Sequence, residues 1–205
     1  MKKTVITILL FLIAIKAVPQ DNPLGIVPDI VNYPPSVTEG SEQNWAIVQD
    51  KRGIMYFGND EKGVLEYDGI NWKTYQMPNK SIVRSLACSE DGVVYVGAVS
   101  EIGFLAPDSV GSLHYESLVP KLDSSHQRFF DVWKTYCEGD RVYFHSEKYV
   151  FTYFPAKDSI SVLTNDRHVL FGFNVNGNFY CGNFPRGLLV LQGDTIMTEA
   201  KGGEY

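Results

Sequence analysis

The side chains that most often carry out chemistry are present in this 205-residue chain, but not at the spacings that catalysis requires. The four histidines form neither a His-Glu-x-x-His sequence nor another close pair of metal ligands. The chain has no Gly-x-Ser-x-Gly sequence and no phosphate-binding glycine loop followed by lysine. Adjacent carboxylates such as Asp60-Glu61 are typical of solvated turns rather than of a glycosidase acid and base. The sequence therefore predicts no catalytic residue, no metal site and no cofactor.

The elements that position the remaining polar residues follow from an internal repeat. The pattern Gly-x-apolar-Tyr-apolar-Gly occurs at residues 53–58, 92–97 and 177–182, with a degenerate copy at residues 140–145. The tyrosines of these copies are 39, 48 and 37 residues apart, in the order Tyr56, Tyr95, Tyr143 and Tyr180. Repeats of roughly 40–50 residues are typical of propeller blades.

Each copy of the repeat also has matching flanks. An apolar run precedes it and another follows it, and the joining turns begin with Asp, Ser or Asn and have Gly in fourth place. Side chains alternate along a strand, so the central strand is apolar on both faces and must be covered on both sides. We therefore expect an all-β fold, a β-propeller with about four four-stranded blades at residues 45–76, 83–117, 130–164 and 169–200.

Residues 20–44 form a proline-rich lead-in to this partial propeller of residues 45–205. Propellers contain roughly 4–8 blades, and an incomplete ring leaves unpaired faces. We therefore expect the chain to be the first part of a longer protein, in which further blades of the same polypeptide are its partners. A complete four-bladed ring is the alternative.

The beginning of the chain has the three parts of a secretory signal peptide. Lys2 and Lys3 are followed by an almost uniformly apolar stretch, residues 5–15, and then by polar sequence from Gln20 onward. Such a stretch is shorter than the roughly 17–25 residues of a membrane-spanning helix. We expect residues 1–19 to be a signal peptide and the protein to be exported, with an uncleaved anchor as the alternative.

Composition excludes one class of partner. The net charge is −6, and removal of residues 1–19 with their three lysines leaves −9. An acidic body of this kind argues against nucleic-acid binding by this segment. The three cysteines, Cys88, Cys137 and Cys181, are an odd number and lie in apolar runs. We interpret them as small structural side chains, and one disulfide with a spare thiol remains the alternative.

The first repeat resembles the two-component regulator propeller family. The resemblance is carried by residues 43–58, 63–69 and Trp72, and by Val94-Tyr95-Val96-Gly97 with Gly103-Phe104-Leu105 after it. It extends over about residues 25–200, and the third copy departs from the pattern because His145 stands in place of the final glycine.

This resemblance implies the periplasmic sensor region of a bacterial signal-transduction regulator, with blades belonging to a seven-bladed ring. Relatives continue into a small β domain, a membrane helix and a cytoplasmic output module such as a histidine kinase, and many respond to glycans. The expected partners are accordingly an oligosaccharide or other small ligand and a second copy of the chain in a homodimer.

A binding surface follows from propeller geometry. The loops from second to third strands open on the same face as the loops that lead into the first strands, and loops are where binding residues concentrate. Polar groups mixed with an aromatic side chain suit a sugar. The candidate ligand-binding residues on this face are Asn59, Asp60, Glu61, Arg84, Glu101, Arg128, Glu147, His168, Phe184 and Arg186.

Two functions from different classes remain after these steps. The first is a non-catalytic sensor that binds a ligand on this face. The second is an exported propeller enzyme acting on polysaccharide, which would need acids, His, Tyr or Arg clustered at one end of the axis. A protein-interaction scaffold is a further alternative.

Overall fold

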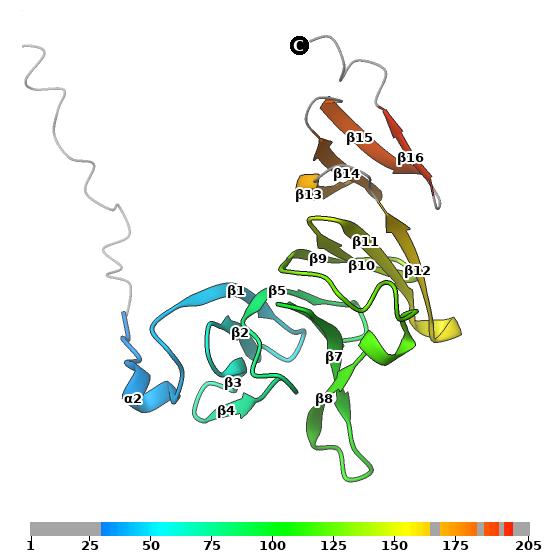
Figure 1. Cartoon of the computed structure of the whole chain (residues 1–205). Helices are drawn as coiled ribbons and strands as arrows, with labels where there is room; N and C mark the ends of the chain where they lie inside the picture. Colours follow the sequence, from blue (N-terminus) through cyan, green and yellow to red (C-terminus); the bar gives the residue numbers. More distant parts are fainter. Residues whose placement is uncertain (1–29, 165–168, 184–186, 193–194, 199–205) are drawn as a thin grey trace, which may run out of the picture. The chain divides into compact units, whose positions relative to one another are not determined.

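The computed structural model describes residues 30–164, 169–183, 187–192 and 195–198 of the chain. The chain divides into two units, residues 1–32 and residues 33–205, and the helices and strands labelled in Figure 1 belong to the second unit. The expected signal peptide lies outside the described residues. No helix in the described ranges is long and apolar enough to cross a membrane.

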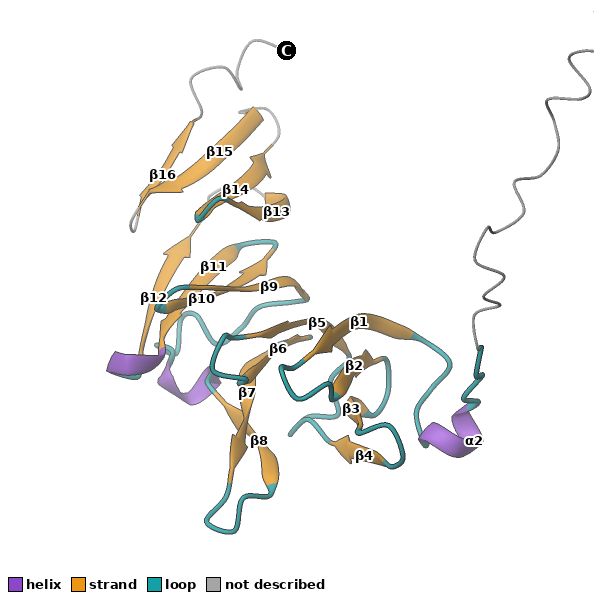
Figure 2. Cartoon of the chain, turned by 180° about the vertical axis from the view of Figure 1, so that it is seen from behind, coloured by secondary structure: helices purple, strands orange, loops and turns teal. Residues whose placement is uncertain are grey.

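The second unit contains four sheets of four antiparallel strands, and the strands of each sheet lie in chain order (Figures 1 and 2). Blade 1 comprises β1 (Asn44–Gln49), β2 (Met55–Asn59), β3 (Gly63–Tyr67) and β4 (Trp72–Tyr75). Blade 2 comprises β5 (Val83–Cys88), β6 (Val94–Ala98), β7 (Glu101–Pro107) and β8 (Leu113–Ser117). Blade 3 comprises β9 (Val132–Glu138), β10 (Arg141–Ser146), β11 (Tyr149–Phe154) and β12 (Ser159–Thr164). Blade 4 comprises β13 (Val169–Val175), β14 (Asn178–Asn183), β15 (Gly187–Gln192) and β16 (Thr195–Thr198).

This architecture confirms the predicted all-β fold of four four-stranded blades. The helices of the described residues are short, and Figure 2 shows them in purple beside the strands. They are α2 (Pro35–Thr38) in the proline-rich lead-in, and the 3-10 helices η2 (Val119–Lys121) and η3 (Pro155–Lys157).

The core is divided into three apolar layers, one between each pair of successive blades. The repeated tyrosines Tyr56, Tyr95 and Tyr143 are buried in the layer that separates their own blade from the next one. Their neighbours along the second strands, such as Val96 and Cys181, are buried in the layer on the opposite side. In blades 2 and 3 the second strand is apolar on both faces because each of these blades is packed between two others.

The three cysteines are free thiols on strands β5, β9 and β14. Cys181 is fully buried, and Cys88 and Cys137 are half-buried beside the apolar layers. These positions agree with the interpretation of the cysteines as small structural side chains.

The hairpin turns between the first and second strands have the chemistry that the sequence predicts. The N–H of Gly53 donates to the carbonyl of Asp50 over 3.0 Å, and the N–H of Gly92 donates to the carbonyl of Ser89 over 3.0 Å. Both glycines have a φ of +87°, which glycine adopts without strain. The repeat of glycine at these positions therefore reflects a repeated turn.

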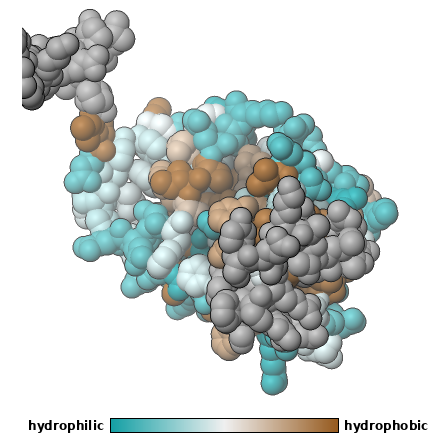
Figure 3. Space-filling view, turned by 90° about the horizontal axis from the view of Figure 1, so that it is seen from above, coloured by the Kyte–Doolittle hydropathy of each residue, from teal (hydrophilic) through white to brown (hydrophobic). Residues whose placement is uncertain are grey.

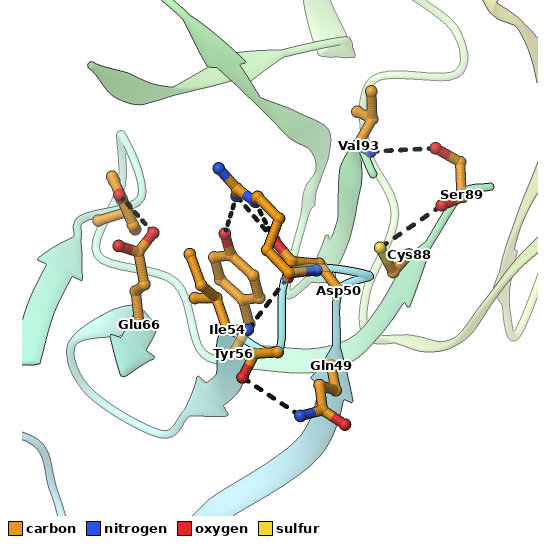
Figure 4. A network of polar contacts seen from close by, with 11 residues as sticks. Gln49, Asp50, Ile54, Tyr56, Glu66, Cys88, Ser89 and Val93 are labelled. Atoms are coloured by element: carbon orange, nitrogen blue, oxygen red, sulfur yellow. Dashed lines mark hydrogen bonds and ion pairs between the residues drawn. The ribbon is translucent and has the colours of Figure 1, made fainter. Parts of the chain in front are cut away.

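The carboxylate of Asp50 fixes the first of these turns (Figure 4). It accepts the N–H groups of Arg52 (2.9 Å) and Ile54 (3.0 Å), and it pairs with the Arg52 guanidinium at 2.7 Å. Burial opposes ionisation of Asp50, but these hydrogen bonds outweigh it, so the pKa of Asp50 lies below its usual value. Because the Arg52 side chain is 64% exposed, the ion pair orders the turn more than it stabilises the fold.

The glycine that ends the second strand makes room for the next blade. A Cβ added at Gly58 would lie 2.8 Å from Cγ1 of Val83, the first residue of blade 2. A Cβ added at Gly97 would lie 2.6 Å from Cγ1 of Val132 and 2.6 Å from Oγ1 of Thr135, both in blade 3. Successive blades approach too closely at this point for any larger residue.

Blade 3 departs from this rule, and blade 4 compensates for it. His145 occupies the glycine position, and Gly172 of blade 4 occupies the position that Thr135 has in blade 3. A Cβ added at Gly172 would lie 3.2 Å from Cγ of His145. The large and small residues of this contact are therefore exchanged between the two blades, and the fold of blade 3 is retained.

The exchange predicts an energetic coupling between the two residues. We expect Gly172→Thr to destabilise the protein by about 1–3 kcal/mol, because the added atoms crowd His145 and the ring of Phe179. In a His145→Gly background the same change should cost less, since Phe179 can move into the vacated space. Urea unfolding of the four proteins measures the coupling, and strictly additive effects would contradict it.

His145 also predicts a pH dependence of stability. The side chain is fully buried and neither ring nitrogen has a hydrogen-bond partner among the described residues. Burial, with a smaller contribution from Lys134, lowers the pKa of His145 from 6.5 to about 4. The unfolded chain therefore takes up this proton at a higher pH than the folded chain. As the pH falls from 6.5 toward 4, protonation of His145 favours the unfolded state, and the free energy of unfolding decreases.

We expect His145→Gln to remove this component, which is on the order of 3 kcal/mol. Denaturation midpoints at several pH values between 7.5 and 4 measure it for both proteins. Equal losses of stability in the wild type and the variant over this range would show that His145 is not the group responsible.

Candidate functional site

The pairing of the first and second strands is interrupted at the same place in every blade. The register skips one residue between Asn44 and Ala46, between Val83 and Ser85, between Val132 and Lys134, and between Val169 and Phe171. Such a bulge leaves its extra residue outside the ladder and re-aims the side chain. The four extra residues are Trp45, Arg84, Trp133 and Leu170.

Three of these residues meet at one point. The guanidinium carbon of Arg84 lies 4.2 Å from the ring centroid of Trp45 and 5.0 Å from that of Trp133. The two indole centroids are 6.2 Å apart, with the ring planes at 72°. Blades 1, 2 and 3 therefore each contribute one bulged side chain to a group in which the arginine cation packs against two aromatic rings.

Two carboxylates complete this group. Nε of Arg84 donates to Oδ1 of Asp131 over 2.6 Å, and Nη1 lies 3.9 Å from Oδ1 of Asp60. The Trp45 indole N–H donates to Oδ1 of Asp60 over 2.9 Å, which fixes the orientation of that ring. We call these five residues, Trp45, Asp60, Arg84, Asp131 and Trp133, the bulge cluster.

The bulge cluster combines a buried centre with accessible rings. The Arg84 side chain is 14% exposed, whereas Trp45 and Trp133 are each 41% exposed. Arg84 Nη1 is buried and has no acceptor among the described residues. Unsatisfied buried donors are rare in folded proteins and need an explanation. A bound ligand is one such explanation.

Apolar side chains are also exposed elsewhere on the first strands. The space-filling view in Figure 3 shows hydrophobic residues gathered on the visible face and bordered by hydrophilic ones. Exposed large apolar residues of the first strands are Trp45, Ile47, Trp133, Phe171, Phe173 and Val175. Exposed apolar groups of this kind mark binding surfaces more often than single scattered residues do.

Asn59 positions the acidic loop beside the bulge cluster. It is fully buried, its side-chain oxygen accepts the N–H groups of Ser41, Glu61 and Lys62, and its amide donates to the carbonyl of Gln43. These bonds tie the turn after β2 to the end of the lead-in. Asn59 therefore holds this turn in place and does not itself offer an accessible group to a ligand.

Asp60 and Glu61 do reach the surface. They line an open pocket together with residues of the lead-in, namely Pro35, Ser41, Glu42 and Gln43. Asp60 belongs both to this pocket and to the bulge cluster, so the two are continuous.

Glu101 lies elsewhere, inside blade 2. It is 5% exposed, and its carboxylate accepts hydrogen bonds from the hydroxyls of Ser117 and Tyr115. Burial raises the pKa of Glu101 above its usual value, although the two hydrogen bonds oppose the shift. Its surroundings are those of a structural carboxyl group.

The structure thus brings together two of the sequence-predicted site residues, Asp60 and Arg84, with Glu61 close by in sequence. Arg128 is exposed in the loop before β9, and Glu147 is exposed in the turn between β10 and β11. Neither residue belongs to the bulge cluster. The remaining candidates, His168, Phe184 and Arg186, lie outside the described residues.

Sequence reasoning missed Trp45, Trp133 and Asp131 as site residues. The two tryptophans lie in apolar runs, which favoured a role in the core. Aligning the repeats places both in the same position as Arg84, and this alignment was the signal that could have found them. The bulge that turns them outward has no signature in the sequence.

The bulge cluster is suited to binding rather than to bond cleavage. Indole faces stack on the apolar faces of sugar rings, and carboxylates accept hydrogen bonds from hydroxyl groups. Its acids are paired with an arginine and an indole N–H. Among the described residues, no group of three His, Cys, Asp or Glu side chains could hold a metal ion.

Comparison with known proteins identifies the architecture. No family model and no curated protein matches the sequence. The extracellular domain of the putative hybrid two-component system BT4673 from B. thetaiotaomicron matches with a TM-score of 0.59 and 18% identity, over 75% of this chain and 21% of that chain. The corresponding domain of BT3049 from the same organism matches with a TM-score of 0.56 and 16% identity, over 88% of this chain and 25% of that chain.

The fold is that of a β-propeller. Virginiamycin B lyase from Staphylococcus aureus has it as well, with a TM-score of 0.54 and 10% identity over 77% of this chain and 56% of that chain. The presence of two-component extracellular domains among the structural neighbours agrees with the resemblance found in the sequence. This chain spans only 21% and 25% of the length of those two extracellular domains.

The ion pair at the centre of the bulge cluster yields a prediction about stability. Arg84→Met and Asp131→Asn should show a coupling of about 1–2 kcal/mol in a double-mutant cycle, because the pair is largely shielded from solvent. The exposed pair Arg141–Asp140 serves as a control, with an expected coupling below about 0.5 kcal/mol. The coupling is measured by chemical denaturation. Equal coupling in the two cycles would contradict the claim that Arg84 and Asp131 form a shielded ion pair.

Proposed function

We propose that this chain is an extracytoplasmic ligand-binding propeller region of a bacterial signal-transduction regulator, that it responds to glycans, and that it is not itself catalytic. The observation that carries the proposal is the bulge cluster. Three blades each present one large side chain at the same repeat position, and the result is a fixed cation packed against two accessible indoles, with two carboxylates beside it.

Three further observations support a sensor role. The sequence begins with the pattern of a secretory signal peptide, which favours export to the periplasm. Its repeats resemble the two-component regulator propeller family. Extracellular domains of hybrid two-component systems are among its structural neighbours.

The proposal includes further blades as partners. Tyr56, Tyr95 and Tyr143 are buried by the blade that follows their own, whereas the corresponding Tyr180 of blade 4 is only half-buried. Leu188, which pairs with Gly182 on the next strand, is 37% exposed. An additional blade would cover these residues, and a homodimer would couple ligand binding to the output. The ligand can shift that coupling only by its differential affinity for the two states.

An exported enzyme is the second candidate, because a lyase is among the proteins of similar fold. The described part of the chain offers it little chemistry. Glu101, whose pKa is raised, is buried between β7 and β8 and is bonded to Ser117 and Tyr115. The carboxylates of the bulge cluster are already paired with Arg84 and Trp45. The geometry therefore favours binding over turnover.

Ligand-dependent stabilisation tests the proposal. We expect at least one member of an oligosaccharide panel to raise the melting temperature, since a ligand at 100 times its dissociation constant adds roughly 2.7 kcal/mol. Trp133→Ala should weaken that ligand about 3- to 10-fold through loss of aromatic contact. Trp72→Phe is the control, because Trp72 packs against Tyr33, Tyr67 and Phe57 and has no contact with the bulge cluster among the interactions above.

An absence of stabilisation by every saccharide in the panel would remove the glycan part of the proposal. Hydrolysis or elimination products formed by the purified protein would favour the enzyme instead.

A further inference from the structure

We propose that the bulge cluster selects an uncharged saccharide and discriminates against chains that carry uronic acids or sulfate. The inference rests on the proposed function and names the ligand class of the same site. An arginine packed against two tryptophans would at first sight favour an anionic ligand. The geometry of the cluster argues the opposite.

The charge of Arg84 is partly neutralised by a carboxylate. Its Nε donates to Asp131 over 2.6 Å, and its guanidinium carbon lies within 5.0 Å of both indole centroids. Asp131 bonds Nε in the plane of the guanidinium and the indoles pack against the group, so Arg84 is a partly neutralised cation whose position is fixed. Arg84 therefore acts as a fixed group that packs against both tryptophans, which also contact each other edge to face, and it orders the carboxylates.

Apart from Arg84, the charged side chains of the cluster and of the pocket that adjoins it are negative. Asp60 and Asp131 share the single Arg84 cation, and the adjoining pocket adds the carboxylates of Glu42 and Glu61. Two like charges about 4 Å apart cost roughly 1 kcal/mol in water and roughly 4 kcal/mol near a protein surface. Among the described residues that line the cluster and the pocket, Arg84 is the one cation against four carboxylates, so an anionic sugar would meet a net negative charge.

A neutral sugar fits the same groups. Hydroxyl groups are hydrogen-bond donors, and the outward lone pairs of Asp60 and Asp131 are acceptors, whereas a ligand carboxylate or sulfate has no proton to offer them. Charge-assisted hydrogen bonds from hydroxyl to carboxylate are the stronger kind. The exposed parts of the two indoles supply apolar faces, and the N–H bond to Asp60 holds the Trp45 ring ready for stacking.

The donor that lacks an acceptor is consistent with this ligand class. Nη1 of Arg84 points toward Asp60 but is 3.9 Å from it, beyond hydrogen-bond distance. Because Nη1 is buried, a ligand would reach it only after a side chain of the cluster moves. A hydroxyl group at this point could accept from Nη1 and donate to Asp60, whereas an anion could only accept.

The repeat explains how selectivity is built. The bulge places one side chain per blade on the same level, and this position varies as Trp, Arg and Trp in blades 1, 2 and 3 while the surrounding strand residues remain structural. We therefore assign the bulge position as the one that determines ligand class.

Calorimetric titration of the full chain with hexasaccharides tests the inference. The neutral probes are gluco-, xylo-, manno- and galacto-hexaoses, and the anionic probes are oligogalacturonate and chondroitin sulfate hexasaccharides. We expect at least one neutral probe to bind, each anionic probe to bind at least tenfold more weakly, and neutral binding to change less than twofold between 0.15 and 0.5 M salt.

Variants locate the selectivity. Asp60→Asn should weaken the neutral probe about 5- to 10-fold and raise the relative affinity of the anionic probes, because it removes a charged acceptor and one repulsive charge. Glu90→Gln is the matched control, since it removes one negative charge from the turn after β5, at the opposite end of that strand from Arg84. Trp133→Phe serves beside Trp133→Ala, so that a folded variant tests the aromatic contact.

The outcomes separate this inference from the function on which it rests. Tighter binding of an anionic probe than of every neutral one would overturn the inference and leave glycan sensing intact. Neutral binding that both Trp133 variants and Asp60→Asn leave unchanged would place the site elsewhere and also overturn it. Binding of no saccharide at all would overturn both.

Discussion

The close approach of successive blades at the end of the second strand is the contact on which the rest of the structure depends. At Gly97 the backbone lies so near to blade 3 that an added Cβ would meet Val132, Thr135 and Ser85 within 2.6 Å. Ser85 closes the same contact from its own blade by donating to the carbonyl of Val132 over 2.7 Å. A densely packed interface that includes a buried hydrogen bond allows only one arrangement of neighbouring blades.

The position of the bulge cluster follows from this contact. The bulge lies next to the glycine contact in the register of each blade, so blades that pack there bring their bulged side chains to the same level. Trp45 and Trp133 are almost 90 positions apart in the sequence, and both pack against Arg84. The exchange of His145 and Gly172 shows that the contact can be preserved with its large and small partners reversed.

Much of the fold could be predicted from the sequence, and part of the site could not. The spacing of the tyrosines and the turn glycines predicted four blades, because the same local chemistry recurs wherever the same turn and packing recur. Asp60 and Arg84 were predicted from their loops and lie in the cluster. Asn59 and Glu101 have the same loop context, but side-chain direction and burial depend on tertiary packing, which the sequence pattern does not contain. Trp45 and Trp133 were missed because a bulge reverses the inward direction that their apolar neighbours imply.

The most direct test of this account is the effect of Gly97→Ala on stability and on tryptophan fluorescence, measured together in one urea titration. The account predicts a loss of about 1–3 kcal/mol and a changed native emission spectrum, because blade 3 must move away and separate Trp133 from Arg84. Val132→Ala in the same chain should recover part of both, since Cγ1 of Val132 is one of the atoms in the way. Unchanged stability and an unchanged spectrum in Gly97→Ala would contradict the claim that this contact positions the site.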